Sequence, residues 1–228
     1  MPDQSVMSAW QHLADAIEMS RTQLQKAGGT IHCRAGCGNC CRLAVMTTAA
    51  EARGLARKIT EPTRERLEHY IDRLRTLLPA IADRTDLVRL HPHQLGPCPF
   101  LGPDEHCDVH AHRPLACRAL LATRPADWCG LNLSTLPDIE RRLFLDSLDA
   151  NLVALPTHYL QAPLEKARQL EQELLARPNL NLYGHLPTLV WLEITVGLEQ
   201  VAERDSAGFS DQTDTSDLIH PALVEVTG

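Results

Sequence analysis

The eight cysteines of this sequence are the residues whose type and spacing most directly indicate a chemical function. They form two groups, separated by a long stretch without cysteine: Cys33, Cys37, Cys40 and Cys41, and then Cys98, Cys107, Cys117 and Cys129. Thiolates are strong, soft ligands for zinc and for iron. The sequence therefore predicts a metal-binding protein, with all eight cysteines as candidate ligands.

The first group reads Cys33-Arg-Ala-Gly-Cys37-Gly-Asn-Cys40-Cys41. Gly36 and Gly38 allow a tight bend that aims three or four sulfurs at a shared centre. Adjacent side chains project about 100° apart on a helix, so Cys40 and Cys41 do not face one ion in the same way. Either they serve two metal ions, or one binds metal while its neighbour packs.

The second group is spaced too widely for one loop to form a site unaided. It lies in a segment, residues 84–132, whose recurring prolines prevent long regular elements. We therefore expect these cysteines to complete sites begun by the first group, which would staple 84–132 onto the 33–41 loop. Eight thiols suffice for two sites of four ligands, or for one iron–sulfur cluster plus a zinc ion.

The pattern CxxxCxxCC, followed by CPFL at 98–101, by Cys107 and by RPxxCR at 113–118, resembles the YkgJ-type cysteine-cluster proteins. These proteins are described as zinc- or iron-chelating domains. The resemblance covers residues 33–129 and is carried by blocks in the same order, with Cys129 as the looser match. It implies metal chelation and supplies no substrate.

The metal is either zinc or iron in an iron–sulfur cluster, and the sequence supports the two nearly equally. Closed all-thiolate tetrahedra suit zinc, whereas a cysteine triplet with a remote fourth ligand suits an iron–sulfur cluster. We slightly favour iron–sulfur, because the spacing is unlike paired CxxC zinc knuckles. A radical SAM site is disfavoured by Asn39, by the extra Cys41 and by the helical texture. Disulfides are disfavoured because the N-terminus lacks signal-peptide features, which predicts a cytoplasmic, reducing compartment.

Charged neighbours of the cysteines have two interpretations. Arg113 and Arg118 either assist cofactor binding, by offsetting thiolate charge, or pair with carboxylates. Six histidines lie near cysteines in the sequence. Asp108, His110 and His112 would share one face of an extended segment, as in an iron site with two histidines and one carboxylate, and His110 is the leading candidate. Solvated loop histidines are the simpler interpretation.

The rest of the chain predicts a mainly α fold: a small helical domain with an irregular, metal-stapled cysteine-rich centre. Apolar spacing and caps predict helices near 5–27, 48–59, from Pro62, 114–122, 136–154, 158–177 and 187–203. Strand signals are weak. We expect one domain over 1–204, with its metal motif at 33–129, and an acidic, flexible tail over 205–228. Within that tail the sequence leaves two alternatives for residues 218–226, a loose end or an extended piece that folds back.

Composition narrows the function classes. The chain has 228 residues, 44% of them hydrophobic, and a net charge of −7. This charge argues against nucleic-acid binding, and no stretch is apolar enough to span a membrane. The expected partner is a metal ion. Three functions stay open: non-enzymatic metal handling, an iron-dependent enzyme acting on a peptide or small molecule, and a zinc-shaped module that binds a protein partner.

Overall fold

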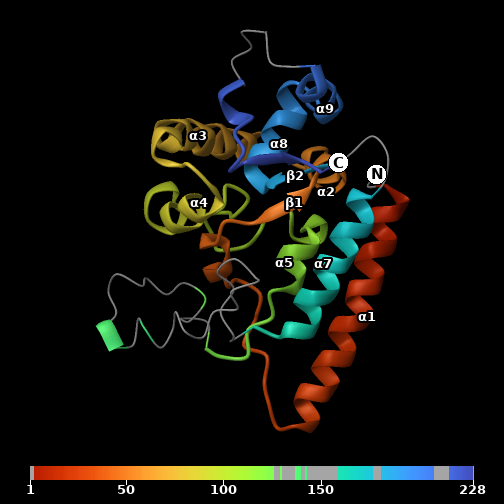
Figure 1. The fold of residues 1–228 in the computed structure, drawn as a ribbon. Coiled ribbons are helices and arrows are strands. Elements are labelled where there is room, and N and C mark those ends of the chain that lie inside the picture. Colours follow the sequence, from red (N-terminus) through yellow and green to blue (C-terminus); the bar gives the residue numbers. More distant parts are fainter. Residues whose placement is uncertain are drawn as a thin grey trace.

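A computed structural model describes residues 3–125, 129, 137–139, 142, 159–176, 181–207 and 216–227. These residues are mostly helical, which confirms the predicted mainly α class, and three short strands form a small sheet (Figure 1). The helices are α1 (Gln4–Lys26), α2 (Ala49–Ala56), α3 (Glu61–Leu77), α4 (Arg84–Leu90), α5 (Leu115–Ala119), α7 (Gln161–Leu175), α8 (Leu186–Thr195) and α9 (Leu198–Ala207).

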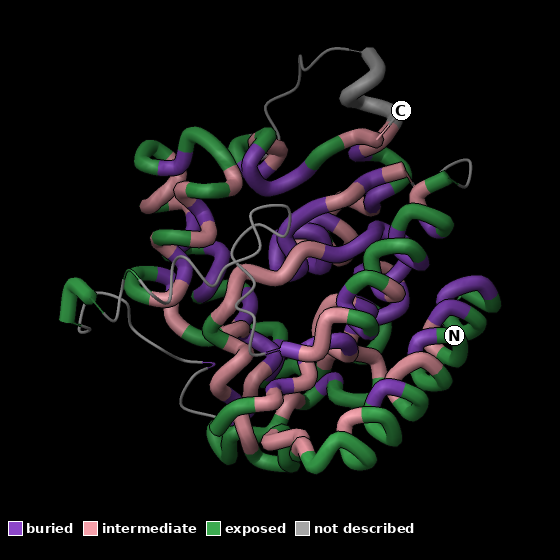
Figure 2. Tube along the Cα trace, turned by 60° about the horizontal axis from the view of Figure 1, so that its bottom comes forward, coloured by how far each residue is buried: buried purple, intermediate pink, exposed green. Residues whose placement is uncertain are grey.

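A glycine ends the first helix, and a capping box begins the second. Helix α1 buries Val6 and Leu13 on one face, while the opposite face is exposed along its length (Figure 2). It ends before Gly28, whose φ of +78° suits glycine. Helix α2 starts with the predicted capping box between Thr48 and Glu51. Among the described helices, none combines the length and the apolar character needed to cross a membrane.

The structure corrects one predicted helix, and a second predicted helix lies mostly outside the described residues. The single helix expected over 187–203 is two helices, α8 and α9, which meet at Gly197. This glycine has a φ of +92°, a conformation that ends an α-helix. The helix expected over 136–154 lies mostly outside the described residues.

A three-stranded antiparallel sheet joins distant parts of the chain. Its order is β1 (Met46–Thr48), β2 (Leu182–His185) and β3 (Val224–Val226). Thr47 pairs with Gly184, and Tyr183 pairs with Glu225. Strands this short cannot display a sustained alternation of apolar and polar residues, which explains the weak strand signals in the sequence.

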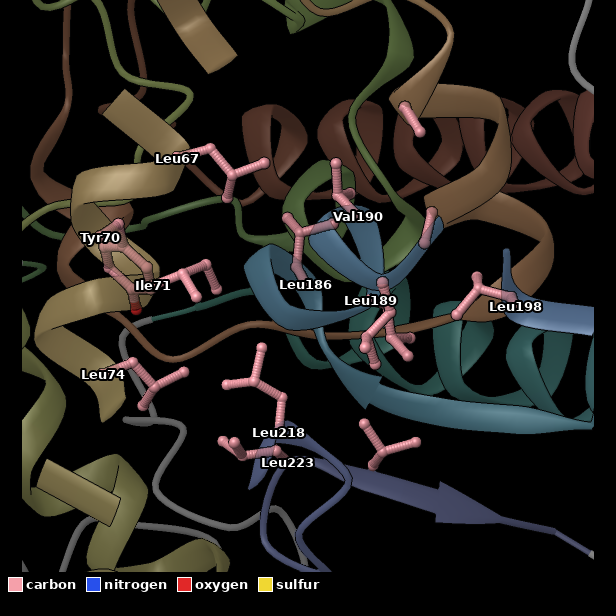
Figure 3. Packing of buried hydrophobic residues seen from close by; sticks show 14 of the residues in the cluster. Leu67, Tyr70, Ile71, Leu74, Leu186, Leu189, Val190, Leu198, Leu218 and Leu223 are labelled. Atoms are coloured by element: carbon pink, nitrogen blue, oxygen red, sulfur yellow. The ribbon is translucent and has the colours of Figure 1, made fainter. Parts of the chain in front are cut away.

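Of the two alternatives for the end of the chain, the structure has residues 216–227 folded back onto the core. Leu218 and Leu223 are fully buried, and β3 completes the sheet. Figure 3 shows both leucines facing the side chains of α3 and α8. Apolar residues after the acidic stretch gain more by covering this core than by remaining in water. Residues 208–215 lie outside the described chain.

Two clusters of buried residues form the core. The larger cluster joins α2, α3, α4, α8, α9 and the sheet, and Figure 3 shows its centre, where Leu67 and Ile71 of α3 approach Leu186 of α8. The smaller cluster joins α1, α5 and α7. The cysteine segments are packed against both clusters.

One buried carboxyl group stands out in this core. Glu171 of α7 is 5% exposed, and its Oε1 has no hydrogen-bond partner among the described residues. Burial raises the pKa of Glu171 well above the ordinary carboxyl value, and the nearby Glu51 carboxylate raises it further. Arg168 and a hydrogen bond with Tyr183 act in the opposite direction. Glu171 is therefore protonated in the folded chain at pH values where it ionises in the unfolded chain.

Glu171→Gln should stabilise the fold increasingly as pH rises. Above pH ~4.3 the unfolded wild-type chain loses this proton while the folded chain keeps it, so stability falls with rising pH until the folded group ionises. The glutamine removes that loss. We expect the Tm of the variant minus that of the wild type to grow between about pH 5 and pH 8. Glu173→Gln, exposed on the same helix, is the control, and an equal Tm difference at every pH would refute the assignment.

Candidate functional site

The first cysteine segment bends through glycines against a second loop. Gly36 has a φ of +72°, and a side chain there would approach the His106 ring. A Cβ at Gly38 would lie 2.9 Å from the Leu101 side chain and closer still to the Glu105 carboxylate. These glycines therefore allow the 33–41 loop to pack directly on residues 101–106.

Backbone hydrogen bonds join the two cysteine segments. The Cys98 N–H donates to the Cys41 carbonyl over 2.7 Å. Leu101 then pairs with Cys107 across a tight turn, in which the Gly102 N–H donates to the His106 carbonyl over 2.7 Å. The two groups of cysteines, far apart in sequence, are thus held side by side.

Cys117 is brought to the same place by α5. Pro114 precedes this helix, and the Leu115 N–H donates to Glu51 Oε1 over 2.7 Å. The other oxygen, Oε2, accepts hydrogen bonds from Thr47 and Thr48. The carboxylate that caps α2 therefore also holds the start of α5. The sequence showed the capping box but not this second role, because the partner lies 64 residues away.

Six thiols line one cavity of about 230 Å³. They belong to Cys37, Cys40, Cys41, Cys98, Cys107 and Cys117, and the apolar part of the wall comes from Val45, Leu55, Phe100, Leu120 and Leu186. The structure thus brings together six of the eight cysteines that the sequence singled out. All eight are free thiols.

Cys33 and Cys129 lie outside the lining of this cavity. The Cys33 thiol is exposed; it accepts the Ala122 N–H over 3.3 Å and donates to the Leu120 carbonyl over 3.6 Å. Cys129 is buried in the smaller core cluster, where its thiol is hydrogen-bonded to the Tyr159 hydroxyl. Both thiols are close enough to Cys40 to interact with it electrostatically.

Burial opposes the ionisation of several of these thiols. It raises the pKa of Cys98 and of Cys117 far above the ordinary thiol value, and neighbouring cysteines add to the effect. For Cys40, the hydrogen bond with Cys41 raises the pKa most, followed by burial. Burial raises the pKa of Cys129 to about 11. Deprotonated thiolates in this cavity therefore need a compensating positive charge.

Arg113 supplies one such charge, whereas Arg118 is turned away. Arg113 lines the cavity and lowers the pKa of Cys107 and Cys117. Its Nε has no hydrogen-bond partner among the described residues, and no ion pair found there includes it. Arg118 instead donates to the carbonyls of Arg113 and Ala111, over 2.6 and 2.5 Å. Its guanidinium lies 4.2 Å from the centre of the Trp10 ring.

The arrangement of Asp108, His110 and His112 on one face is wrong. Asp108 forms an ion pair with Arg66, and His112 lies beside Trp10 with 6.2 Å between ring centres. Only His110 of the three lines the cavity. The segment is not extended, because residues 110–112 form a turn of 3-10 helix that rotates successive side chains apart.

His91 has a structural environment instead of a solvated one. It is 1% exposed, and its Nδ1 lies 2.9 Å from the Arg42 carbonyl, one residue beyond Cys41. Burial lowers the pKa of His91 to about 4, so the ring is neutral and its Nδ1–H donates to that carbonyl. Tyr70 and His185 surround it in the core. No pattern in the sequence distinguishes this histidine from the exposed ones.

The donor set suits a thiophilic metal, although the side chains do not yet enclose an ion. Six soft thiols and the guanidinium of Arg113 meet at the cavity. Among the described residues, no three His, Cys, Asp or Glu side chains stand close enough to hold one ion directly. Binding would therefore at least require the thiols to rotate about χ1. Zinc and iron are the metals that such a set prefers.

Comparison with known proteins gives one match. Residues 32–134 match a family model described as "CxxCxxCC: Putative zinc- or iron-chelating domain", and this range contains all eight cysteines. The match supports a metal-binding role for the cysteine segments, as the sequence predicted. Neither curated proteins nor solved structures yielded a match to the chain.

Glu51→Gln should loosen the link between α2 and α5. A glutamine side chain has one acceptor oxygen, which cannot serve both the Leu115 N–H and the threonine donors, so a buried donor loses its partner. We expect the free energy of unfolding to fall by about 1–3 kcal/mol, measured by urea denaturation. Glu68→Gln, exposed on α3, should change it little. Equal stability of Glu51→Gln and wild type would show that the Leu115 contact contributes nothing.

Proposed function

We propose that this protein binds iron through its clustered cysteines, as an iron–sulfur cluster. The observation that carries the proposal is the cavity of about 230 Å³ lined by six thiols. At roughly 30 Å³ per water molecule, that space equals seven or eight waters, more than a single ion closed in by four sulfurs leaves. A cluster of several atoms fits such a space better.

The remaining features of the site agree with this proposal. Cys37, Cys40, Cys41, Cys98, Cys107 and Cys117 would supply the ligands, with Cys33 and Cys129 adjoining them. A bound cluster would supply one-electron redox chemistry and would fix the proline-rich segment 84–132 to the 33–41 loop. Arg113 would offset part of the negative charge that four thiolates bring.

Protein purified without air tests the metal. We expect a brown preparation with broad visible absorption, with iron and acid-labile sulfide in matching amounts and little zinc. Elemental analysis, a sulfide assay and the absorption spectrum measure these together. Colourless protein that contains zinc would contradict the cluster while leaving metal binding intact. Protein that takes up neither metal, even after anaerobic reconstitution, would overturn the proposed function.

Arg113→Gln and Arg118→Gln should behave differently. Removing the cavity guanidinium leaves thiolate charge uncompensated, so we expect the Arg113 variant to bind metal about 10–100-fold more weakly. Arg118 contacts backbone carbonyls and Trp10, so its variant should keep the metal and lose only stability. Transfer of metal to a chelator measures affinity, and thermal unfolding measures stability. Equal metal loss in both variants would remove Arg113 from the site.

A further inference from the structure

Hydrogen bonds fix the backbone of Cys41 on both sides. Its N–H donates to the Gly38 carbonyl over 3.0 Å, and its carbonyl accepts the Cys98 N–H over 2.7 Å. The next carbonyl, of Arg42, accepts a hydrogen bond from the buried ring of His91. Since a thiol reaches an ion by rotation about χ1, its reach depends on where its backbone is held.

The hydrogen bond between His91 and Arg42 has a defined direction. A carbonyl oxygen can only accept, so the Nδ1 of His91, 2.9 Å away, carries the hydrogen. The ring is 1% exposed and lies outside the lining of the thiol cavity. His91 therefore acts on the site through the backbone next to Cys41 and not through contact with a thiol.

Rings from two other elements hold His91 in place. Tyr70 of α3 lies 6.0 Å from it and His185 of β2 lies 5.8 Å from it, measured between ring centres. The Tyr70 hydroxyl is 3.3 Å from His185 Nε2, and the Thr188 hydroxyl is 3.0 Å from His185 Nδ1. Because β2 also pairs with β1, the chain after the cysteine pair is tied to the larger core by strand pairing and by this ring.

The backbone after His91 departs from an ordinary α-helix. Residues His91–Leu95 form one turn of π-helix, closed by a hydrogen bond from the Gly96 N–H to the His91 carbonyl over 3.3 Å. Gly96 has a φ of +84°, a conformation that residues with side chains rarely adopt. Such turns are rare and occur frequently at functional sites. Here the turn leads from the buried ring to Cys98, so one short segment supports the Cys41 backbone twice.

We infer that His91 is a positioning residue for the metal site, because the hydrogen bond from its ring fixes the backbone on which Cys41 presents its thiol. This inference rests on the proposed function and extends it to a residue that touches neither the cavity nor the metal. Without the bond, the peptide after Cys41 is freer to rotate. Part of the free energy of metal binding then goes into ordering this loop, and affinity falls.

Two amide variants separate the hydrogen bond from the volume of the ring. In His91→Asn the amide nitrogen takes the place of Nδ1, whereas in His91→Gln it lies one bond farther from the backbone. Glutamine fills the space of the ring better, yet only asparagine keeps the donor in position. We expect His91→Asn to bind Zn²⁺ nearly as tightly as the wild type, and His91→Gln to bind it about 10-fold more weakly. Competition between the reduced, metal-free full chain and a chromophoric chelator measures these affinities.

Tyr70→Phe is the matched control. It removes the hydroxyl that contacts His185 and so disturbs the same buried group, but it leaves the Arg42 carbonyl paired with His91. Its Tm should fall while its Zn²⁺ affinity stays that of the wild type. Circular dichroism shows whether each variant keeps its helices.

Hydrogen exchange in the metal-free chain gives a readout that does not depend on metal. The amides of Cys41 and Cys98 donate the backbone bonds that hold the cysteine pair. Mass spectrometry of peptides covering 38–45 and 96–101 should show faster exchange in His91→Gln than in His91→Asn or Tyr70→Phe.

The wild type offers a test that needs no variant. The ring N–H of His91 should give a nuclear magnetic resonance signal that is protected from exchange with water, and this signal should shift when Zn²⁺ binds. A signal that stays unchanged at saturating Zn²⁺ would overturn the link between the ring and the site.

The affinities decide the remaining outcomes. Equal Zn²⁺ affinity of His91→Gln and wild type would overturn the positioning role while leaving the proposed metal binding in place. So would an equal loss in His91→Gln and Tyr70→Phe, because the effect would then belong to the core in general. Weaker binding by His91→Asn than by His91→Gln would show that the ring acts through its volume. A wild type that binds neither Zn²⁺ nor a reconstituted cluster would instead refute the proposed function.

Discussion

The cost of placing charge in an enclosed space governs this structure. Six thiols share a cavity walled by leucine, valine and phenylalanine, where burial keeps the pKa of Cys98 and Cys117 high and so keeps these two thiols neutral. Neutral thiols behave as small apolar groups and pack without penalty. The same cavity becomes costly once sulfur is charged, unless a cation enters with the charge. Metal binding and proton release are therefore coupled, and Arg113 supplies positive charge that is already in place.

Contacts with the surrounding helices hold in place loops that have little regular structure of their own. Between Leu90 and Leu115 the described chain contains only single turns of helix and one isolated bridge. Its shape is fixed from outside, by Glu51 on α2, by the core helices and by the 33–41 loop. The buried ring of His91 adds a further contact, since it holds the carbonyl that follows the cysteine pair. Order in this region comes from long-range contacts, which explains how a proline-rich segment can present ligands at defined places.

The sequence predicted what depends on local chemistry. The apolar stripe of α1, the capping box of α2 and the buried face of α3 follow from spacings of three and four residues and from side chains next to helix ends. The convergence of the two cysteine groups followed from chemistry as well, because the second group is spaced too widely to complete a site alone. The sheet, the break at Gly197 and the packing of Leu218 depend on contacts between distant segments, for which no short pattern exists. The failure of the Asp108, His110 and His112 arrangement has the same origin: it assumed extended backbone where the chain turns. Arg113 and Arg118 belong to one sequence motif, but Arg113 lines the cavity and Arg118 lies against Trp10. This difference also depends on contacts between distant segments.

Ala122 donates its N–H to the Cys33 thiol and pairs with Tyr159, which follows the last cysteine in the chain, and this order has a consequence for biosynthesis. When the ribosome has released all eight cysteines, the chain after Cys129 is still missing, including α7, the strand β2 that pairs with β1, and the strand β3 that pairs with β2. At that moment Leu186 of the cavity wall is still missing, and contacts between residues so far apart in sequence form slowly. The nascent chain thus passes through a stage in which its thiols are less enclosed than in the folded chain, and more accessible to oxidants and to thiophilic ions. A chaperone that shields this intermediate, or an ion supply matched to the pace of translation, would decide how much of the finished protein carries the right metal.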